Sequence, residues 1–484
     1  MTNNNVSPHI AINRHLSQPY RNQHIHFIGI CGVAMSALAL AFKDKGWRVT
    51  GSDKGFYPPV STHLKDAGVS FYPGWHPEKM TENGIPDLVV VGNVAGSNNP
   101  EWLFVQKNDI PYASYPEVIA QYFVKEHSLV CAGTYGKSTS TAALVWIFQH
   151  AGISPSYMFG GVSNNNVPAA TLGDTEWSIL EGDEYKSSGW DEKAKFFHYN
   201  PTHLLLTSIV WDHADVYPNA SSYKEAFSNL VAQLPKDGLF TVSEKVRMDY
   251  PHFLENVACP VVTYGKEKKN TYQYTNIATS TSGITFDIIH DGTTYHVATP
   301  LLGDYMADNF TGCFATAHQA GIAPETIVSA IGTFQNIKRR LEKKYEGKIT
   351  IFDDIAHSPK KAEAVLNSLR ALYDGKIIAI FEPNIGNRQP DAAPGYTHAF
   401  DNADMVILPR FSPVKKNPKL PQPFEAHDLQ HIISQTHGNV VAINDDAALL
   451  EMVNKETNAG DVVVFLGSHG FRGMIEELVL NLSL

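Results

Sequence analysis

Short apolar runs alternate with longer amphipathic stretches along most of the chain. Residues 24–30 predict a buried strand, residues 34–45 a helix and residues 47–50 a second strand. The same alternation returns after residue 128 and again after residue 349. Strands that alternate with helices indicate parallel, doubly wound sheets, so the pattern predicts an α/β protein.

Residues 240–299 follow a different pattern. Short stretches of alternating apolar and polar residues are separated there by turn-forming pairs, which predicts an antiparallel extension along one sheet edge. Turns are expected at Tyr264-Gly265, Ser282-Gly283 and Asp291-Gly292.

The length of 484 residues predicts about three domains. A polar segment, residues 1–22, precedes the first strand and is expected to be a flexible extension. The expected domains are residues 23–127, 128–336 and 337–484, the first and third Rossmann-like and the central one resembling a phosphate-loop ATPase with the antiparallel extension.

Composition narrows the class of protein. A hydrophobic content of 43% with 18% charged residues is typical of globular domains. A net charge of −11 makes nucleic acid an unfavourable partner. The four cysteines are widely separated and form no CxxC motif, which argues against a disulfide framework or a zinc site. With no apolar run long enough to cross a membrane and no signal peptide, we expect a cytoplasmic protein without a membrane partner.

A glycine-rich loop between a strand and a helix dominates the central region. The backbone N–H groups of such a loop and the positive end of the helix dipole bind polyphosphate. Lys137 would reach the β- and γ-phosphates, and Ser138 would hold a magnesium ion. Cys131 replaces the first glycine of the strict motif, so the alternative is an ordinary strand–helix turn. The loop comprises Gly133, Thr134, Tyr135, Gly136, Lys137, Ser138 and Thr139.

A second glycine turn follows the first strand. Gly29 and Gly32 lie in a degenerate dinucleotide fingerprint, and Asp53 follows the turn by about 20 positions, as in ribose-binding folds. The pattern supports a nucleotide or a nucleotide-sugar diphosphate without deciding between NAD and UDP. The alternative is a glycine turn that serves helix–strand packing alone.

Acidic residues and a histidine follow two central strands. Ligands of open α/β sheets bind at the carboxyl ends of the strands, so these side chains are expected to converge near the glycine-rich loop. A carboxylate and a neutral imidazole could complete a magnesium site there. The alternative is a set of solvated charges at strand ends. The residues are Glu181, Asp183, Asp212, His213 and Asp215.

The ordered set of motifs resembles the Mur ligase family, the ATP-dependent amide-forming enzymes of peptidoglycan assembly. The resemblance rests on residues 133–139, 181–184, 212–215, 338–340 and 353–357, in the family's order and spacing. Further stretches resemble the murein peptide ligase branch of that family. These are residues 57–62, 90–93, 99–100, 184–185, 195–199, 381–383 and 470–473.

The resemblance implies ligands for each domain. The first domain would bind UDP through Gly29, Gly32, Ser52, Asp53 and Asn93. Catalysis would depend on Lys137, Glu181, His213 and Arg340, and magnesium would be held by Ser138, Glu181 and His213. The remaining contacts to ATP would come from the glycine-rich loop, Asn309, Arg340, Asp353 and His357.

The implied reaction proceeds in two steps. The lactyl carboxylate of UDP-N-acetylmuramate attacks the γ-phosphate of ATP, and the amine of L-Ala-γ-D-Glu-meso-diaminopimelate then attacks the resulting acyl phosphate. This is a step of peptidoglycan recycling, carried out by a monomer or a homodimer. The alternatives are a ligase that adds L-alanine, a non-catalytic regulator that binds UDP-sugars, and an NAD-dependent oxidoreductase supported only by residues 29–53.

The chain departs from the family pattern at several positions. Tyr305-Met306 stands where Gly-x-His-Asn is usual, and Asn384 stands where the tripeptide-adding branch has arginine. An amide cannot replace a guanidinium that pairs with a carboxylate. Arg388 could supply that charge instead. Phe227 stands where other members carry a carbamoylated lysine, so a second magnesium held in that way is not expected.

Overall fold

A computed structural model describes residues 23–56, 60–211, 216–255, 257–413 and 422–483. The expected extension 1–22 and Asp212, His213 and Asp215 lie outside the described residues. The chain forms two compact units. The first contains the described residues up to Asn276 with Phe286–Thr299 and Ala307–Ile337, and the second contains Ile277–Thr285, Pro300–Met306 and the described residues from Lys338 on.

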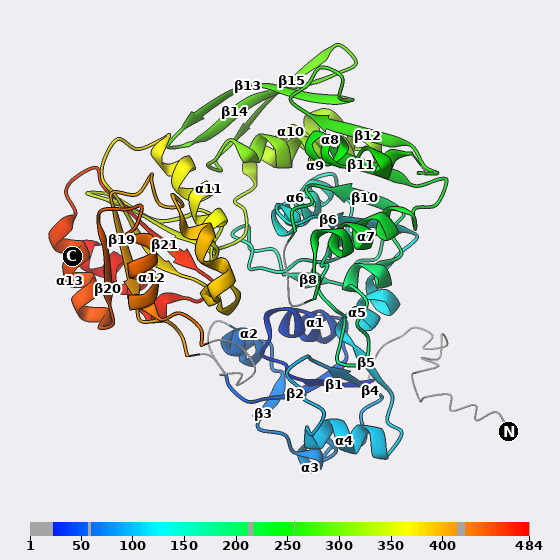
Figure 1. Cartoon of the computed structure of the whole chain (residues 1–484). Coiled ribbons are helices and arrows are strands. Elements are labelled where there is room, and N and C mark those ends of the chain that lie inside the picture. Colours follow the sequence, from blue (N-terminus) through cyan, green and yellow to red (C-terminus); the bar gives the residue numbers. More distant parts are fainter. Residues whose placement is uncertain (1–22, 57–59, 212–215, 256, 414–421, 484) are drawn as a thin grey trace. The chain divides into compact units, whose positions relative to one another are not determined.

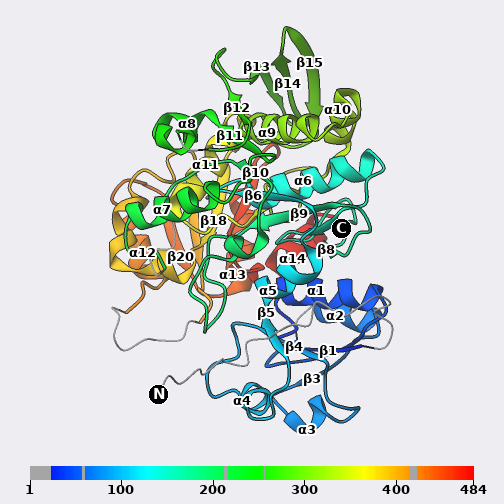
Figure 2. The same cartoon turned by 90° about the vertical axis from the view of Figure 1, so that its right-hand side faces the viewer.

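The first sheet is parallel, with the strand order β3-β2-β1-β4-β5. Helices α1 and α2 cover one face, and α3 and α4 cover the other (Figures 1 and 2). The predicted strand–helix–strand unit at residues 24–50 is therefore confirmed. The elements are β1 (His24–Ile28), α1 (Val33–Asp44), β2 (Arg48–Asp53), α2 (Val60–Asp66), β3 (Ser70–Pro73), α3 (Pro77–Met80), β4 (Leu88–Val91), α4 (Pro100–Lys107), β5 (Tyr112–Ser114), α5 (Tyr115–Val118) and the π-helix η1 (Ile119–Phe123).

The second sheet has the order β15-β14-β13-β12-β11-β10-β6-β9-β7-β8. Its central strands pair in parallel. The strands are β6 (His127–Ala132), β7 (Ser156–Met158), β8 (Ala170–Thr171), β9 (Trp177–Gly182), β10 (His203–Leu206), β11 (Leu239–Ser243), β12 (Val261–Gly265), β13 (Tyr272–Ser280), β14 (Gly283–His290) and β15 (Thr293–Thr299). The helices are α6 (Lys137–His150), η2 (Lys195–Tyr199), α7 (Ala220–Val231), α8 (Glu244–Asp249), η3 (Pro251–Leu254), α9 (Tyr305–Gln319) and α10 (Pro324–Thr333).

One predicted turn of the antiparallel extension is wrong. Tyr264 and Gly265 lie inside β12, which pairs with β13 in parallel through Tyr264–Tyr272 and Gly265–Gln273. Two parallel partners require a connection that returns along the strand, and residues 266–271 provide it. The other two predicted turns do connect β13 to β14 and β14 to β15, which are neighbours in the sheet.

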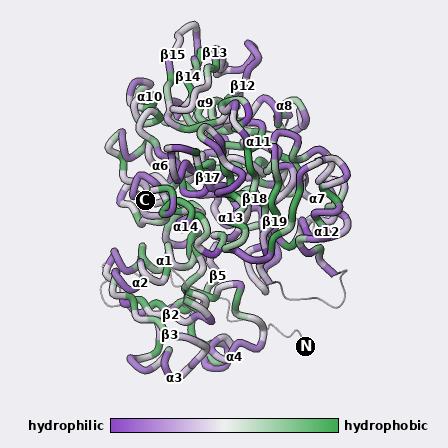
Figure 3. The backbone as a smooth tube through the Cα atoms, turned by 90° about the vertical axis from the view of Figure 1, so that its left-hand side faces the viewer, coloured by the Kyte–Doolittle hydropathy of each residue, from purple (hydrophilic) through white to green (hydrophobic). Residues whose placement is uncertain are grey.

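The third sheet has the order β16-β17-β21-β18-β19-β20, and only its edge strand β16 is antiparallel. The inner strands are hydrophobic along their length, as β18 and β19 show in Figure 3, because helices cover both faces. The elements are β16 (Glu342–Glu346), β17 (Thr350–Asp354), α11 (Pro359–Arg370), β18 (Ile377–Glu382), η4 (Ile385–Arg388), η5 (Pro390–Tyr396), β19 (Met405–Pro409), α12 (Ala426–Ile433), β20 (Val440–Ile443), α13 (Asp446–Glu456), β21 (Val462–Gly467), η6 (Phe471–Gly473) and α14 (Met474–Ser483).

Candidate active site

The glycine-rich loop joins the buried strand β6 to helix α6, as the sequence predicts. Gly133 and Gly136 have φ angles of +131° and +81°, a region that favours glycine. A Cβ atom on Gly133 would clash with Thr207, and one on Gly136 would lie 2.6 Å from Oδ1 of Asn309. Asn309 thus lies beside the loop with which the resemblance associates it, and the loop conformation requires both glycines.

Two side chains fix the loop to the segment that follows β10. The Thr134 hydroxyl donates to the carbonyl of Val210 at 2.8 Å, and the amide of Tyr135 donates to the hydroxyl of Ser208 at 2.9 Å. Helix α6 begins at Lys137, so its first N–H groups lie at the loop. The loop is therefore a rigid site with the positive end of a helix dipole, suited to polyphosphate.

Lys137 forms a buried ion pair. Its Nζ lies 2.9 Å from Oε2 of Glu184, whose side chain is 1% exposed. Burial lowers the pKa of Lys137, but the Glu184 carboxylate outweighs this effect and raises the pKa above its usual value. The ammonium is therefore charged and held where the glycine-rich loop enters α6.

Ser138 and Glu181 meet at the same place. The Ser138 hydroxyl donates to Oε1 of Glu181 at 2.5 Å, and the amide of Gly160 donates to Oε2 at 2.5 Å. Burial raises the pKa of Glu181 and outweighs the effect of these bonds. A hydroxyl and a carboxylate are oxygen ligands of the kind that Mg²⁺ prefers, so the pair fits a magnesium ion. Among the described residues, no group of three or more His, Cys, Asp and Glu side chains is arranged for a metal.

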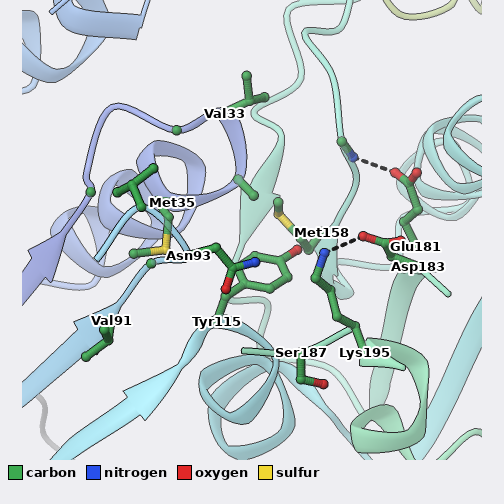
Figure 4. A pocket seen from close by; sticks show the side chains of 16 residues that line it. Val33, Met35, Val91, Asn93, Tyr115, Met158, Glu181, Asp183, Ser187 and Lys195 are labelled. Atoms are coloured by element: carbon green, nitrogen blue, oxygen red, sulfur yellow. Dashed lines mark hydrogen bonds and ion pairs between the residues drawn. The ribbon is translucent and has the colours of Figure 1, made fainter. Parts of the chain in front are cut away.

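A cavity of about 310 Å³ connects this region with the first sheet (Figure 4). The glycine turn after β1 and the end of β4 form one wall, which includes Gly29, Gly32 and Asn93. The ends of β9 and η2 form the other wall, where the Lys195 and Asp183 side chains point toward each other. Three residues of the predicted UDP-sugar site therefore share one cavity with Glu181 of the predicted magnesium site.

Three family models match the chain in succession: the Mur ligase family catalytic domain over residues 24–126, the Mur ligase middle domain over 131–317 and the Mur ligase glutamate ligase domain over 339–469. The UDP-N-acetylmuramate–L-alanyl-γ-D-glutamyl-meso-2,6-diaminoheptandioate ligase of Haemophilus influenzae is 32% identical over 401 residues, which cover 80% of this chain and 85% of that protein. The chain belongs to the Mur ligase family. As a Mur ligase, it is an ATP-dependent ligase with a three-domain α/β fold.

Two further comparisons show how broad the similarity is within the Mur ligases. The UDP-N-acetylmuramate–L-alanine ligase of Rhodopseudomonas palustris is 28% identical and covers 92% of this chain and 94% of that protein. The crystal structure of a murein peptide ligase from Psychrobacter arcticus matches with a TM-score of 0.70 at 25% identity, over 95% of this chain and 98% of that one. No helix among the described residues combines the length and the apolar character needed to cross a membrane.

Ser52 and Asp53 are placed differently from the other residues of the predicted UDP-sugar site. The Ser52 hydroxyl is fully buried and donates to Oε2 of Glu101 at 2.5 Å. The Asp53 carboxylate accepts a hydrogen bond from the amide of Cys31 at 2.8 Å, within the glycine turn. Neither residue belongs to the described lining of the cavity. In the described structure the Asp53 carboxylate holds the glycine turn in place, whereas the Ser52 hydroxyl is bound to Glu101.

Glu101 is a buried carboxylate beneath this turn. It accepts hydrogen bonds from Ser52, from the Tyr72 hydroxyl at 2.6 Å and from the amide of His76 at 2.8 Å. Burial raises its pKa, but these bonds and the nearby His26 outweigh burial and hold the pKa of Glu101 below its usual value. The ionised carboxylate is therefore an integral part of the first domain.

Replacing Glu101 with glutamine is expected to lower the free energy of unfolding by about 2–3 kcal/mol at pH 7, since it removes acceptors from buried donors. The lowered pKa means that the carboxylate stabilises the fold fully above its usual value of 4.5 and loses this effect as the pH falls through the lower folded-state value. Urea unfolding at pH 7 and near pH 3 should show the difference between the two proteins shrinking on acidification. Glu78→Gln, at an exposed site, is the control and should change little.

The predicted ATP contacts Arg340, Asp353 and His357 belong to the second unit. The Asp353 carboxylate pairs with Nε of Arg339 at 3.2 Å, and the Arg339 guanidinium also donates to backbone carbonyls at the end of β21 and directly after it. Nδ1 of His357 lies 2.8 Å from the carbonyl of Ile355. Arg339 therefore has a structural role at the end of β17, and the roles of Arg340, Asp353 and His357 stay predictions.

The structure contradicts the hypothesis that Arg388 replaces the missing arginine at position 384. The Arg388 side chain is 3% exposed and donates to the carbonyls of Phe424 at 2.8 Å and Ser412 at 3.1 Å, and it pairs with Glu425 at 3.0 Å. Asn384 caps the short helix η4, accepting from the amide of Asn387 at 3.1 Å. Arg388 is thus bound within the protein and is not available to a substrate carboxylate.

Sequence reasoning missed two features of this Mur ligase site. From the sequence, Glu184 is only one of several acidic residues at the end of a predicted strand. In the structure it is the buried partner of Lys137. From the sequence, Lys195 is only part of the stretch 195–199 that resembles the murein peptide ligase branch. In the structure it lines the cavity. The partner of Glu184 and the position of Lys195 depend on which loops meet in the folded protein. The spacing of residues in the sequence does not indicate which loops these are. Phe227 is buried in the hydrophobic core.

Proposed function

We propose that this Mur ligase joins the lactyl carboxylate of UDP-N-acetylmuramate to the amine of L-Ala-γ-D-Glu-meso-diaminopimelate, in the peptidoglycan recycling carried out in the cytoplasm. The observation that carries the proposal is the shared cavity, in which the glycine turn of the first sheet faces Glu181, the hydrogen-bond partner of Ser138 in the phosphate-binding loop. An acid bound to a nucleotide sugar at the turn would meet the end of ATP there. The similarity to the Haemophilus influenzae ligase named for these two substrates supports the choice of substrates.

The proposal divides the chain into a UDP-sugar domain (23–127), an ATP domain (128–336) and a ligase domain (337–484). Magnesium, held by Ser138, Glu181 and His213, would supply positive charge that offsets the repulsion between phosphate and carboxylate. Asn309, Arg340, Asp353 and His357 are the proposed further contacts to ATP.

Lys137 has a distinct part in the proposed mechanism. In the structure its ammonium neutralises Glu184, and a bound γ-phosphate would compete for the same charge. A carboxylate oxygen then attacks the γ-phosphorus, ADP leaves, and an acyl phosphate forms. Lys137 and Arg340 offset the negative charge that develops in this step. The amine attacks the acyl carbon, loses a proton, and phosphate leaves as the amide forms.

The proposal predicts phosphate release that depends on the amine. Purified protein with ATP, magnesium and UDP-N-acetylmuramate is expected to release phosphate when the tripeptide is added, with formation of one amide per phosphate. L-Alanine at equal concentration should give little. Phosphate release and mass spectrometry of the nucleotide-sugar product measure both quantities. Turnover with alanine alone would contradict the proposed acceptor.

A specific observation favours L-alanine as the second candidate. Asn384 carries no charge and Arg388 is bound to Phe424, Ser412 and Glu425, so neither offers a guanidinium to the distal carboxylates of a tripeptide. L-Alanine would not need one. The same assay decides between the two acceptors. If no amine causes phosphate release, the non-catalytic UDP-sugar regulator becomes the better explanation, and saturable NADH binding without UDP-sugar binding would favour an oxidoreductase.

A further inference from the structure

A lysine outside the phosphate-binding loop lines the cavity. Lys195 begins the short helix η2, and its Nζ lies 2.5 Å from Oδ2 of Asp183. Figure 4 shows the two side chains pointing toward each other beside Tyr115, with Glu181 close by. The Lys195 side chain is 15% exposed, so most of its surface is covered by the rest of the protein.

The backbone around Lys195 is fixed. Its amide donates to the carbonyl of Tyr185 at 3.0 Å, and the amide of Phe196 donates to the carbonyl of Asp183 at 3.2 Å. Phe196 and Tyr199 anchor η2 in the hydrophobic core. Because the backbone cannot move far, any change of partner must come from the flexible side chain, whose four methylene groups let the ammonium move within the cavity.

The charges on the cavity wall make this lysine important for an acidic ligand. Among the described residues that line the cavity, Lys195 is the only lysine or arginine, while Glu181 and Asp183 are both acidic. A carboxylate that enters this space meets two like charges and requires a cation to offset them. Lys137 is not part of the described lining and is paired with Glu184.

We propose that Lys195 binds the carboxylate of the acid substrate, leaving Asp183 when the nucleotide sugar enters. The inference rests on the proposed function and adds a residue that selects a nucleotide sugar bearing an acid over one that lacks it. In the structure, Asp183 holds the ammonium at the cavity wall. In the complex, the ammonium would hold one carboxylate oxygen so that the other can face the γ-phosphate.

The test compares two nucleotide sugars in binding titrations without ATP. UDP-N-acetylmuramate carries the lactyl acid, and UDP-N-acetylglucosamine is the same molecule without it. Lys195→Met should weaken binding of UDP-N-acetylmuramate by about 10- to 100-fold, the usual effect of losing a charged hydrogen bond. Binding of UDP-N-acetylglucosamine should stay within about twofold. Lys193→Met, two residues away on the surface, is the matched control and should change neither.

Two further variants separate substrate binding from a structural role. Lys195→Arg should retain most of the preference for UDP-N-acetylmuramate, because it keeps the charge. Asp183→Asn should increase that preference, because it removes the competing carboxylate while its amide oxygen can still accept the bond from the Tyr185 amide. The second variant tests the inference even if Lys195→Met does not fold.

The outcomes distinguish the inference from the proposed function. If wild-type protein prefers UDP-N-acetylmuramate and Lys195→Met keeps the preference, the inference is wrong and the proposed function stands. Equal weakening of both nucleotide sugars would also overturn it, since that is the effect of a structural lysine. A weaker preference for UDP-N-acetylmuramate in Asp183→Asn would also contradict the inference about Lys195. If the wild-type protein binds neither nucleotide sugar, both the inference and the proposed function are wrong.

Discussion

Replacing Lys137 with methionine is expected to lower amine-dependent phosphate release by about 10²- to 10³-fold, the range found when one group that stabilises transition-state charge is removed. The ammonium belongs to the glycine-rich loop, at the start of α6, and is held in its charged form by Glu184. Without it, the attack of a carboxylate on a phosphate lacks one of the charges that offset repulsion. Phosphate release with saturating UDP-N-acetylmuramate and amine measures the effect.

The same substitution also affects stability, so it needs a control. Lys137→Met leaves Glu184, which is 1% exposed, without its counter-charge, and such a change costs about 3–5 kcal/mol of folding free energy. The double variant Lys137→Met/Glu184→Gln removes the uncompensated carboxylate and should recover most of the stability while staying inactive. If either folded variant keeps more than about a tenth of the activity, Lys137 only neutralises Glu184 and the proposed role is wrong.

The second large effect is expected for Glu181→Gln, in which stability and activity should change in opposite directions. Burial raises the pKa of Glu181, so the ionised carboxylate destabilises the ligand-free fold at neutral pH, and the uncharged amide should raise the melting temperature. Phosphate release should fall by about 10³-fold, because a loss of several kcal/mol of charge stabilisation by the metal corresponds to that factor.

Magnesium titration provides the decisive readout for Glu181. Magnesium with a non-hydrolysable ATP analogue should raise the melting temperature of the wild-type protein and leave that of Glu181→Gln nearly unchanged. Glu176→Gln, at an exposed site just before β9, should respond as the wild type does. An unaltered response in Glu181→Gln would show that this carboxylate holds no magnesium.

The sequence predicts those parts of the fold that are encoded locally. The strand–loop–helix unit at Gly133–Lys137 is one of them, because two glycines with positive φ and an apolar strand are readable from neighbouring residues. The turns after β13 and β14 were predicted for the same reason. The sequence does not predict the parallel pairing of β12 with β13, because the choice of strand partner depends on the whole sheet.

For the candidate site, too, the sequence predicts the local pattern but not which side chains become partners. Ser52 follows a pattern for nucleotide binding, yet its hydroxyl bonds to Glu101, which lies 49 residues further along the chain. Arg388 has the right charge near Asn384, but the carbonyls of Ser412 and Phe424, in the segment between β19 and α12, bind it. A residue type and its spacing indicate what a side chain can do, whereas its actual partner is decided by segments that meet only in the folded protein.

The central claim is that an acid linked to a nucleotide sugar is phosphorylated beside the loop that contains Lys137. The most direct measurement uses UDP-N-acetylmuramate labelled with ¹⁸O in the lactyl carboxylate, with mass analysis of the phosphate released in the presence of the amine. An acyl phosphate requires that one carboxylate oxygen leaves with each phosphate, so one labelled oxygen should appear in phosphate for every amide formed. Amide formation with unlabelled phosphate, or phosphate release without amide, would contradict the account.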